Sequence, residues 1–431
     1  MALNLISLAW GVRDGLRLHA TELEALQLQR LRRLLDHSYE NVPYYRKLFD
    51  SVGFRPGHLK QISDLSAIPI TTRQKLQTTP STELIARGAH LARLERSQTS
   101  GSTGAPLHIY RAPREKWFRL LLTLRAFLHN GMRLTDRVVT ISSRPPSGGA
   151  ECDIWVRRLL RRRWNISFFE EVDVQLRKLL NLRPAVVYGY AANVAVLADL
   201  LLKKGLAPMP LRIAASSGEI LMPGYRRVIQ KAFCVDPVDM YSAADLGHIA
   251  WQCNRRKGFH INADWLHVEI VRQEQSAIPG EFGEVVVTSL YRYAMPLIRY
   301  SPGDFASLGE ALCPCGLGLP LLNSLEGRTQ SLVPLPNGRY FIGFSTLMSQ
   351  FSEVSRYQVV QKALDHFVVN VIPGAGFFSE VLSRVSADLS AKLGAGIRVE
   401  ARAVTASELI QGPGKFRPVI PIGSVDFSQS V

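Results

Sequence analysis

The fold class of this chain is indicated most clearly by residues 184–219, which read PAVVYGYAANVAVLADLLLKKGLAPMPLRIAASSGE. Residues 186–188 form a short β-branched run typical of a buried strand, and residues 193–204 have the length and leucine content of a helix. Residues 211–215 form a second strand-like run, followed at once by a Ser- and Gly-rich turn. A strand, a helix and a strand in this order predict a crossover between parallel strands.

The same alternation extends outward from this stretch. Residues 138–141 (VVTI) predict another strand, and residues 177–182 the end of a helix, so the sheet should be largely parallel. Residues 283–289 (GEVVVTS) predict a strand of a separate, antiparallel section. Ligands of parallel sheets bind beyond the carboxyl ends of the strands, so the turns there are candidates for an active site.

Two further features concern the ends of the chain. Thr21 and Glu24 have the spacing of a capping box and predict a helix that runs through Leu35 and ends before residues 41–43 (NVP). A turn-rich stretch near residues 327–336 predicts a domain boundary, because about a hundred residues with their own patterns follow it. We therefore expect an α/β protein with a large domain at 1–328 and a small α+β domain at 329–431.

Composition and charge narrow the class of protein without choosing a ligand. The chain has 431 residues, of which 46% are hydrophobic and 20% charged, as in soluble globular proteins. Lys and Arg outnumber Asp and Glu by 52 to 36, and the net charge of +16 favours nucleotides, coenzyme A, nucleic acid or an acidic membrane surface. The apolar stretch at 184–198 is too short to span a bilayer, and no secretory signal is evident. We expect a cytoplasmic protein without a membrane span.

A glycine-rich run at residues 99–106 reads TSGSTGAP. Glycines let the backbone approach a phosphate closely, while hydroxyls and exposed amides donate hydrogen bonds to its oxygens. No Gly-Lys-Ser/Thr triplet closes the run, so it is not a Walker A loop. By itself it is compatible with a phosphate-binding loop or with a flexible connection.

This run and seven further segments resemble, in the same order along the chain, the motifs of the adenylate-forming superfamily of acyl-CoA synthetases. They resemble most the phenylacetate–CoA ligase-like branch, which includes capsule-biosynthesis relatives. The segments are residues 42–46 (VPYYR), 68–73 (IPITTR), 216–219 (SSGE), 241–245 (YSAAD), 294–304 (AMPLIRYSPGD), 327–329 (GRT) and 412–415 (GPGK). Together they cover nearly the whole chain, and the set is more specific than any one motif. The resemblance implies a large adenylate-forming domain with mixed and parallel sheets flanked by helices, and a small mobile C-terminal domain.

The resemblance also implies a role for each matching residue. The phosphate loop would wrap the β- and γ-phosphates of ATP through Ser100, Gly101, Ser102, Thr103 and Gly104. The adenine side would be bound by Ser217, Gly218, Glu219 and Tyr241, with Ser242 in the same motif as Tyr241. Asp304 would accept hydrogen bonds from the ribose hydroxyls. Arg328 would pair with a phosphate or a hinge carboxylate, and Lys415 would reach the α-phosphate and the developing acyl–phosphate bond.

Asp245 occupies the position of the family's Glu and would help to hold Mg²⁺, a hard cation that prefers carboxylate and phosphate oxygens. Outside this context an Asp here would be a helix N-cap, and Asp304 an ordinary turn residue. The chain departs from the family in the shorter side chain of Asp245, in Gln330 where an Asp is usual, and in lacking a Lys after Pro106. Arg111, Arg114 or Lys116 could supply that missing charge.

Five cysteines, an odd number in a long chain, argue against a disulfide framework. Cys313 and Cys315 form a tight thiol pair, and with Cys253 and His260 they give three thiols and one imidazole, a common set for structural zinc. Some members of the branch carry similar cysteines around zinc. Cys-x-Cys is not the usual spacing, the imidazole could instead be that of His248 or His267, and unliganded, reduced thiols remain the alternative.

The sequence therefore predicts an AMP-forming acid–thiol ligase that uses ATP and Mg²⁺. It would activate a small carboxylic acid as its acyl-adenylate, release pyrophosphate and pass the acyl group to a thiol, with coenzyme A ranked first. A carrier-protein thiol, an amine or a sugar hydroxyl are alternative acceptors. A different class of protein stays open: the basic run at 157–164 (RRLLRRRW) suits nucleic acid, although a solvated helix face explains it better and no nucleic acid is expected. A catalytically inactive partner protein on the same fold is the other rival.

Overall fold

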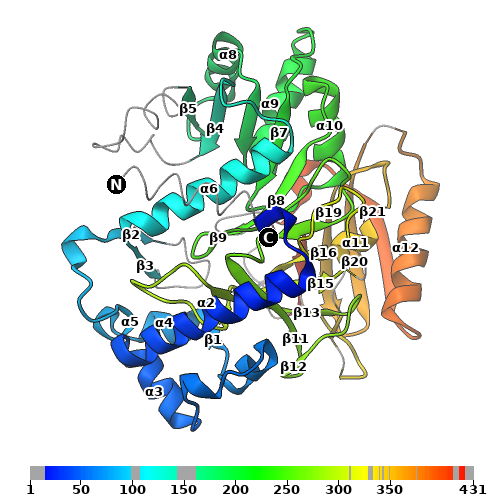
Figure 1. Ribbon diagram of the computed structural model, residues 1–431. Coiled ribbons are helices and arrows are strands. Elements are labelled where there is room, and N and C mark those ends of the chain that lie inside the picture. Colours follow the sequence, from blue (N-terminus) through cyan, green and yellow to red (C-terminus); the bar gives the residue numbers. More distant parts are fainter. Residues whose placement is uncertain are drawn as a thin grey trace. The chain divides into compact units, whose positions relative to one another are not determined.

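The computed structural model describes residues 15–98, 107–142, 162–309, 312–328, 333–338, 340–341, 344–348, 350–374, 376–410 and 417–422 (Figure 1). The chain divides into two compact units. The first unit comprises Met1–Gly131 and Met240–Ser324, and the second unit comprises Met132–Asp239 and Leu325–Val431. The boundary at residue 328 that the sequence suggests stays a prediction.

The N-terminal part of the first unit is helical. The predicted helix is confirmed as α2 (Ala20–Asn41), which is followed by α3 (Pro43–Ser51) with a proline in its first turn. The predicted cap was wrong: the backbone N–H of His19 donates to Glu22 at 2.9 Å, so the helix begins before Thr21. The short element η1 (Gly15–Arg17) precedes α2, and the short elements after α3 are η2 (Pro56–His58), η3 (Ile62–Ala67), α4 (Arg73–Thr78), α5 (Ser81–Leu84) and η4 (Leu91–Arg93).

The first unit is built on a mixed sheet. Its strands are, in spatial order, β1 (Thr71–Thr72), β14 (Tyr300–Ser301), β13 (Phe282–Ser289), β15 (Asp304–Leu308), β16 (Leu321–Arg328), β10 (Phe259–Ile261), β9 (Gly247–Trp251) and β8 (Val238–Ala243). Strand β13 also pairs with β11 (Leu266–Arg272), which pairs with β12 (Gln275–Ser276). The antiparallel pairing of β13 confirms the prediction for residues 283–289.

A separate hairpin of the first unit precedes its long helix. Strands β2 (Glu95–Gln98) and β3 (His108–Arg111) pair antiparallel with Gln98 opposite His108, and α6 (Pro113–His129) follows. The buried side chain of Glu115 in α6 accepts hydrogen bonds from the backbone N–H groups of Tyr293 and Ala294, at 2.8 and 2.9 Å. The start of α6 is thereby joined to the segment that follows β13.

The second unit contains the predicted parallel sheet. Its strands β5 (Arg163–Ser167), β4 (Val138–Ser142), β6 (Val186–Gly189) and β7 (Ile213–Ser217) are all parallel to their neighbours. Helices α8 (Val172–Leu182), α9 (Ala191–Lys203) and α10 (Pro223–Phe233) supply the crossovers, and their apolar faces form one core with the strands. This confirms the strand–helix alternation. The helix expected over residues 157–164 is wrong at its end, because Arg163 and Trp164 lie in β5; residues 157–161 lie outside the described part.

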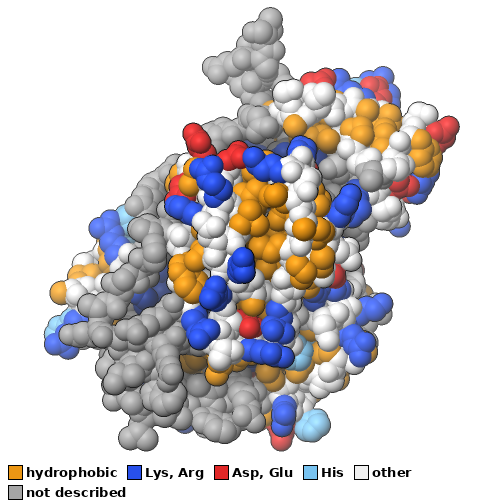
Figure 2. Space-filling view, turned by 90° about the horizontal axis from the view of Figure 1, so that it is seen from above, with side chains coloured by type: hydrophobic (Ala, Val, Ile, Leu, Met, Phe, Trp, Pro, Cys, Tyr) orange, Lys and Arg blue, Asp and Glu red, His pale blue; other side chains and the backbone are white. Residues whose placement is uncertain are grey.

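Figure 2 views the molecule from the end at which α8, α9 and α10 lie in Figure 1. On this face, Lys and Arg side chains border a patch of hydrophobic side chains.

The C-terminal part of the second unit has its own sheet, in the order β21 (Arg398–Ala403), β20 (His366–Pro373), β19 (Val354–Ala363) and β22 (Val419–Ile420). Helix α12 (Glu380–Leu393) packs Val381, Val385 and Leu389 into a core with this sheet. The remaining elements are β17 (Val333–Pro334), β18 (Tyr340–Phe341), α11 (Phe344–Met348) and η6 (Ala406–Glu408). The α/β class with mixed sheets flanked by helices and a distinct C-terminal sheet is confirmed.

Candidate active site

Tyr241 and Asp304 come from two sequence motifs and meet in the first unit. Tyr241 lies in β8 at an irregularity of its pairing with β9, and Asp304 begins β15. The Tyr241 hydroxyl donates to Asp304 Oδ2 at 2.9 Å, across 63 residues of sequence. Burial raises the pKa of Tyr241 well above 10, and the Asp304 charge raises it further, so the phenol stays protonated and remains a donor. The structure thus fixes one carboxylate oxygen of Asp304.

Asp245 is held from two sides. Its carboxylate is buried, it accepts a hydrogen bond at Oδ2 from the Tyr300 hydroxyl, and Arg73 Nη1 lies 3.8 Å from the same oxygen. Burial raises the pKa of Tyr300 well above 10, and the adjacent Asp245 charge adds to this effect. Asp245 is therefore not the exposed cap of a helix. Both contacts are made by Oδ2, and Oδ1 takes part in neither of them.

The motifs of residues 42–46 and 68–73 support this arrangement. Strand β1 pairs in parallel with β14, with Thr71 opposite Tyr300, so Arg73 follows on the chain beside the strand that carries Tyr300. The buried Tyr45 hydroxyl donates to the carbonyl of Pro296 at 3.2 Å and accepts from the N–H of Ile298 at 2.9 Å. The N-terminal motifs therefore position the segment that contains Tyr300 and Asp304.

The Ser-Ser-Gly-Glu turn lies in the second unit, at the carboxyl end of β7. Ser217 is buried and ends the strand, and Gly218 has a φ of +76°, a conformation that favours glycine. The Glu219 carboxylate accepts from the N–H of Ala192 at 3.2 Å, in the first turn of α9. The turn thus lies where a parallel sheet binds ligands, as the sequence predicts.

Several predicted site residues cannot be placed. Those of the phosphate loop (Ser100, Gly101, Ser102, Thr103 and Gly104), together with Lys415 and Gln330, lie outside the described residues. Arg328 is described only as the last residue of β16. What the structure does give is the base of the loop, because its two ends continue into the paired strands β2 and β3.

Sequence reasoning missed the roles of four residues. Tyr300 and Arg73 stand inside recognised motifs, but no pattern marks either as a partner of Asp245. Arg111 was considered only as a source of phosphate-binding charge, yet its guanidinium contacts Ser97 and the carbonyls of Ala244 and Asp245. Arg292 also donates to the Asp245 carbonyl, at 2.6 Å. A signal was present for Arg292, which is a charged residue in a mainly apolar stretch, whereas Arg111 has charged neighbours and gives no such signal.

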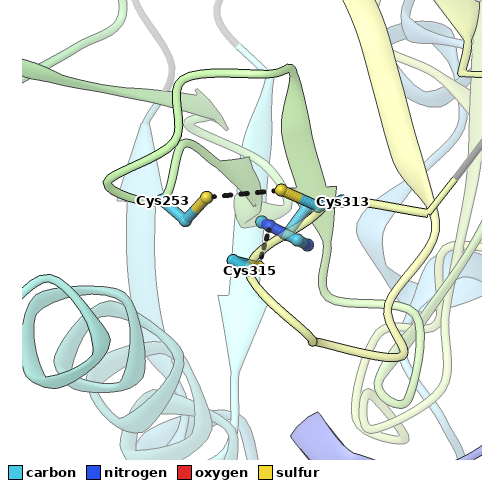
Figure 3. A group of neighbouring side chains, drawn as sticks. Cys253, Cys313 and Cys315 are labelled. Atoms are coloured by element: carbon cyan, nitrogen blue, oxygen red, sulfur yellow. Dashed lines mark hydrogen bonds between the residues drawn. The ribbon is translucent and has the colours of Figure 1, made fainter.

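The predicted zinc ligands converge in the first unit (Figure 3). One ligand atom from each of Cys253, His260, Cys313 and Cys315 lies within 4.8 Å of every other. Cys253 follows β9, His260 lies in β10, and the thiol pair lies on the connection between β15 and β16. His260 is the imidazole of this cluster, rather than His248 or His267.

The distances within the cluster fit a tetrahedral ion. Two thiolates bound to one zinc are about 3.8 Å apart, given a Zn–S bond of about 2.3 Å. The Sγ atoms of Cys253 and Cys313 are 3.6 Å apart, and Cys315 Sγ lies 3.3 Å from His260 Nε2. Burial raises the pKa of the Cys253 thiol and raises that of Cys315 to about 12, so without a metal these two thiols are protonated. A bound cation would reverse this by stabilising the thiolates.

The similar proteins found by comparison of sequences are all phenylacetate–coenzyme A ligases. No family model matches the chain. A phenylacetate–coenzyme A ligase of Thermus thermophilus is 26% identical over 401 residues, which are 85% of each chain. The phenylacetate–coenzyme A ligase of Escherichia coli is 27% identical over 299 residues, 67% of each chain.

Solved structures share the fold. A 2-hydroxyisobutyryl-CoA ligase in the postadenylation state, in complex with R3-HIB-AMP, matches 94% of this chain and 90% of its own, with a TM-score of 0.76 and 21% identity. In the part of this chain that the structure describes, no helix is both long and apolar enough to cross a membrane. The relatives across most of the chain, and the fold shared over nearly all of it, confirm the resemblance to the adenylate-forming superfamily.

Proposed function

We propose that this protein is an AMP-forming acid–thiol ligase that converts a carboxylic acid into its coenzyme A thioester. The relatives named above are phenylacetate–CoA ligases and a 2-hydroxyisobutyryl-CoA ligase, one structure of which contains both an acyl-AMP and CoA. The observation that carries the proposal is the contact between Tyr241 and Asp304. It joins two motifs that the resemblance assigns to one nucleotide, and it leaves a carboxylate oriented to accept hydrogen bonds.

The first half-reaction joins two anions. A carboxylate oxygen of the acid attacks the α-phosphorus of ATP, the bond to the β-phosphate oxygen breaks, and pyrophosphate leaves. Catalysis then depends on charge neutralisation and alignment. We assign Asp304 to the ribose hydroxyls, the turn of Ser217, Gly218 and Glu219 to the adenine, the loop Ser100–Gly104 to the departing phosphates, and Lys415 to the α-phosphate.

Asp245 is the residue that would hold Mg²⁺. Its buried carboxylate is oriented by Tyr300 and faced by Arg73, while Oδ1 is outside both contacts. An oxygen ligand of this kind suits Mg²⁺, which binds through one or two carboxylates and the phosphates of its nucleotide. When bound, the ion would neutralise phosphate charge. The side chain is one methylene shorter than the family's Glu, and the Tyr300 hydroxyl orients its carboxylate.

The second half-reaction needs a thiol. The sulfur of coenzyme A attacks the acyl carbonyl of the adenylate, the acyl–phosphate bond breaks, and AMP leaves with the bonding electrons. Coenzyme A is the acceptor that the names of the relatives support. The excess of Lys and Arg on this chain suits a polyphosphate co-substrate of this kind. We also propose that the reaction takes place in the cytoplasm, where ATP and coenzyme A are available.

The test is pyrophosphate release from MgATP with a panel of acids, without coenzyme A. The panel begins with phenylacetate and 2-hydroxyisobutyrate and continues with other aryl, aliphatic and amino acids. We expect release that depends on one class of acid, and thioester formation once coenzyme A is added. Release without thioester would point to another acceptor. Absence of release with every acid, together with absence of ATP binding by calorimetry, would exclude the proposed function.

We further propose that Cys253, His260, Cys313 and Cys315 bind a structural zinc ion. We expect about one zinc per chain, and Cys313→Ser should lower the melting temperature by about 5–10 °C, because structural zinc contributes folding free energy directly. Differential scanning fluorimetry with metal analysis measures both quantities. Cys234→Ser is the matched control, since Cys234 is exposed and lies outside the cluster. Zinc-free protein with equal melting temperatures for both variants would contradict the proposal.

A further inference from the structure

In the part of the chain that the structure describes, two buried arginines of the first unit form no ion pair with a carboxylate. Arg111 in β3 is 2% exposed and Arg292, shortly after β13, is 1% exposed. A buried guanidinium is normally paired with a carboxylate, because removing a charge from water is costly. Among the described residues, neither arginine has a carboxylate oxygen within 4.0 Å. The two charges therefore demand another explanation.

The donors of both guanidiniums point to one turn of the backbone, the turn that carries Asp245. Arg292 Nη1 donates to the carbonyl of Asp245 at 2.6 Å, and Arg111 Nη2 donates to the carbonyl of Ala244 at 2.7 Å. A weaker contact joins Arg111 Nη2 to the Asp245 carbonyl at 3.4 Å. Two cations thus fix the main chain from which the Asp245 carboxylate projects.

The opposite side of each guanidinium contacts the hairpin β2–β3. Arg111, itself in β3, donates to the hydroxyl of Ser97 in β2, and Arg292 Nη2 donates to the carbonyl of Tyr110 in β3 at 3.4 Å. The backbone beyond Arg292 is held in turn by Glu115. Both arginines therefore connect the base of the glycine-rich loop to the turn of Asp245.

Arg111 stays charged at neutral pH. Burial, together with the positive charges of Arg119 and Arg292, lowers the pKa of Arg111 to about 9, which still leaves the group protonated at pH 7. In the described part of the chain, the Nε atoms of Arg111 and Arg292 have no hydrogen-bond partner.

We propose that Arg111 and Arg292 are positioning residues for adenylation, which fix the Asp245 turn relative to the hairpin that carries the phosphate loop. This inference rests on the proposed function, because it assigns Asp245 to the nucleotide's metal ion. Neither arginine touches the reacting atoms. They keep the Asp245 carboxylate and the base of the loop at the spacing that a metal-bound polyphosphate requires. In an active site, a displacement of about 1 Å can lower the rate about 100-fold.

The experiment compares Arg292→Met, Arg292→Lys and Arg111→Lys with the wild-type protein. Arg30→Met is the matched control, because Arg30 also donates to a main-chain carbonyl, that of Asp264, but away from the Asp245 turn. Calorimetry measures ATP binding over a series of Mg²⁺ concentrations. Pyrophosphate release gives kcat and KM with the acid that the panel identifies.

We expect Arg292→Met to lower kcat about 10- to 100-fold and to raise the Mg²⁺ concentration needed for half-maximal ATP binding. The KM for the acid should change less than threefold. Arg292→Lys should recover part of kcat, since one ammonium donor can still reach the Asp245 carbonyl. Arg30→Met should change the melting temperature only.

Variants that lose stability but keep the wild-type kcat and Mg²⁺ dependence would overturn the inference and leave a structural role. If Arg292→Met fails to fold, the two Lys variants decide by the same criterion. If the wild-type protein releases no pyrophosphate, the proposed function is excluded. The positioning of Asp245 is then judged from Mg²⁺-dependent ATP binding alone. If ATP binding depends on the Mg²⁺ concentration equally in the wild type and the variants, the positioning role is overturned.

Discussion

Lys415→Ala should reduce acid-dependent pyrophosphate release by about 100- to 1,000-fold and leave the melting temperature within about 1 °C of wild type. A group that stabilises charge developing in the transition state typically contributes a rate factor of this size. Lys415 is the one cation that the sequence resemblance directs to the α-phosphate, where the charge of two reacting anions accumulates. It follows a Gly-Pro-Gly segment close to the C-terminus, outside the described residues, so its assignment rests on sequence alone.

Lys392→Ala provides the control for this prediction, since Lys392 lies in the last turn of α12 and is exposed. It removes the same charge from the C-terminal region, and we expect unchanged kinetics. Stopped-flow or coupled pyrophosphate assays with saturating MgATP measure both variants. A Lys415→Ala protein that retains more than half of the wild-type rate would remove this residue from the mechanism.

Asp304→Ala should weaken ATP binding by about 100-fold or more. Hydrogen bonds to a charged group contribute about 1.5–3 kcal/mol each, and the proposed ribose contact involves two hydroxyls. Tyr241→Phe should weaken binding only about threefold to tenfold, because it removes the 2.9 Å hydrogen bond that orients Asp304 but keeps the carboxylate. The two changes should not be additive, since Tyr241 acts through Asp304, and isothermal titration of the double variant measures that coupling.

The chain offers a matched surface pair as the control for Asp304 and Tyr241. The Tyr39 hydroxyl donates to Asp50 at 3.0 Å in an exposed part of the N-terminal helices. Asp50→Ala and Tyr39→Phe remove the same chemical groups, and we expect ATP affinity within twofold of wild type. Equal effects of Asp304→Ala and Asp50→Ala would show that Asp304 has no specific role in nucleotide binding.

The features that the sequence predicted correctly depend on residues close together in the chain or on a set of recognisable motifs. The parallel sheet of the second unit follows from β-branched runs separated by helices, and those elements fell within a few residues of their predicted bounds. The cysteine cluster was found because its members are chemically distinctive, even though Cys253 and Cys313 are 60 residues apart. In each case the residue types themselves restrict what the segment can do.

The parts of the site that the sequence did not predict depend on contacts between segments that are distant in the sequence. Arg111 reaches Ala244 across 133 residues and Tyr300 reaches Asp245 across 55, and no periodicity or spacing encodes such a pair. The cap of α2 was wrong for another reason: Glu22 and Glu24 are both near the start of the helix, and the residue at which the backbone becomes helical decides that Glu22 meets the N–H of His19. The phosphate loop and Lys415 stay predictions from sequence.

The cysteine cluster has a consequence for the entropy of the unfolded chain. Cys253 and Cys313 enclose a segment of about sixty residues, and this segment contains Arg292, Tyr300 and Asp304. For a disulfide, closing a loop of that size costs about 4 kcal/mol of chain entropy. If the proposed zinc ion remained bound to the thiolates of the unfolded chain, refolding would not have to meet that entropic cost again. The ion would then act far from ATP, by shortening the conformational search of the segment that carries the nucleotide-binding residues.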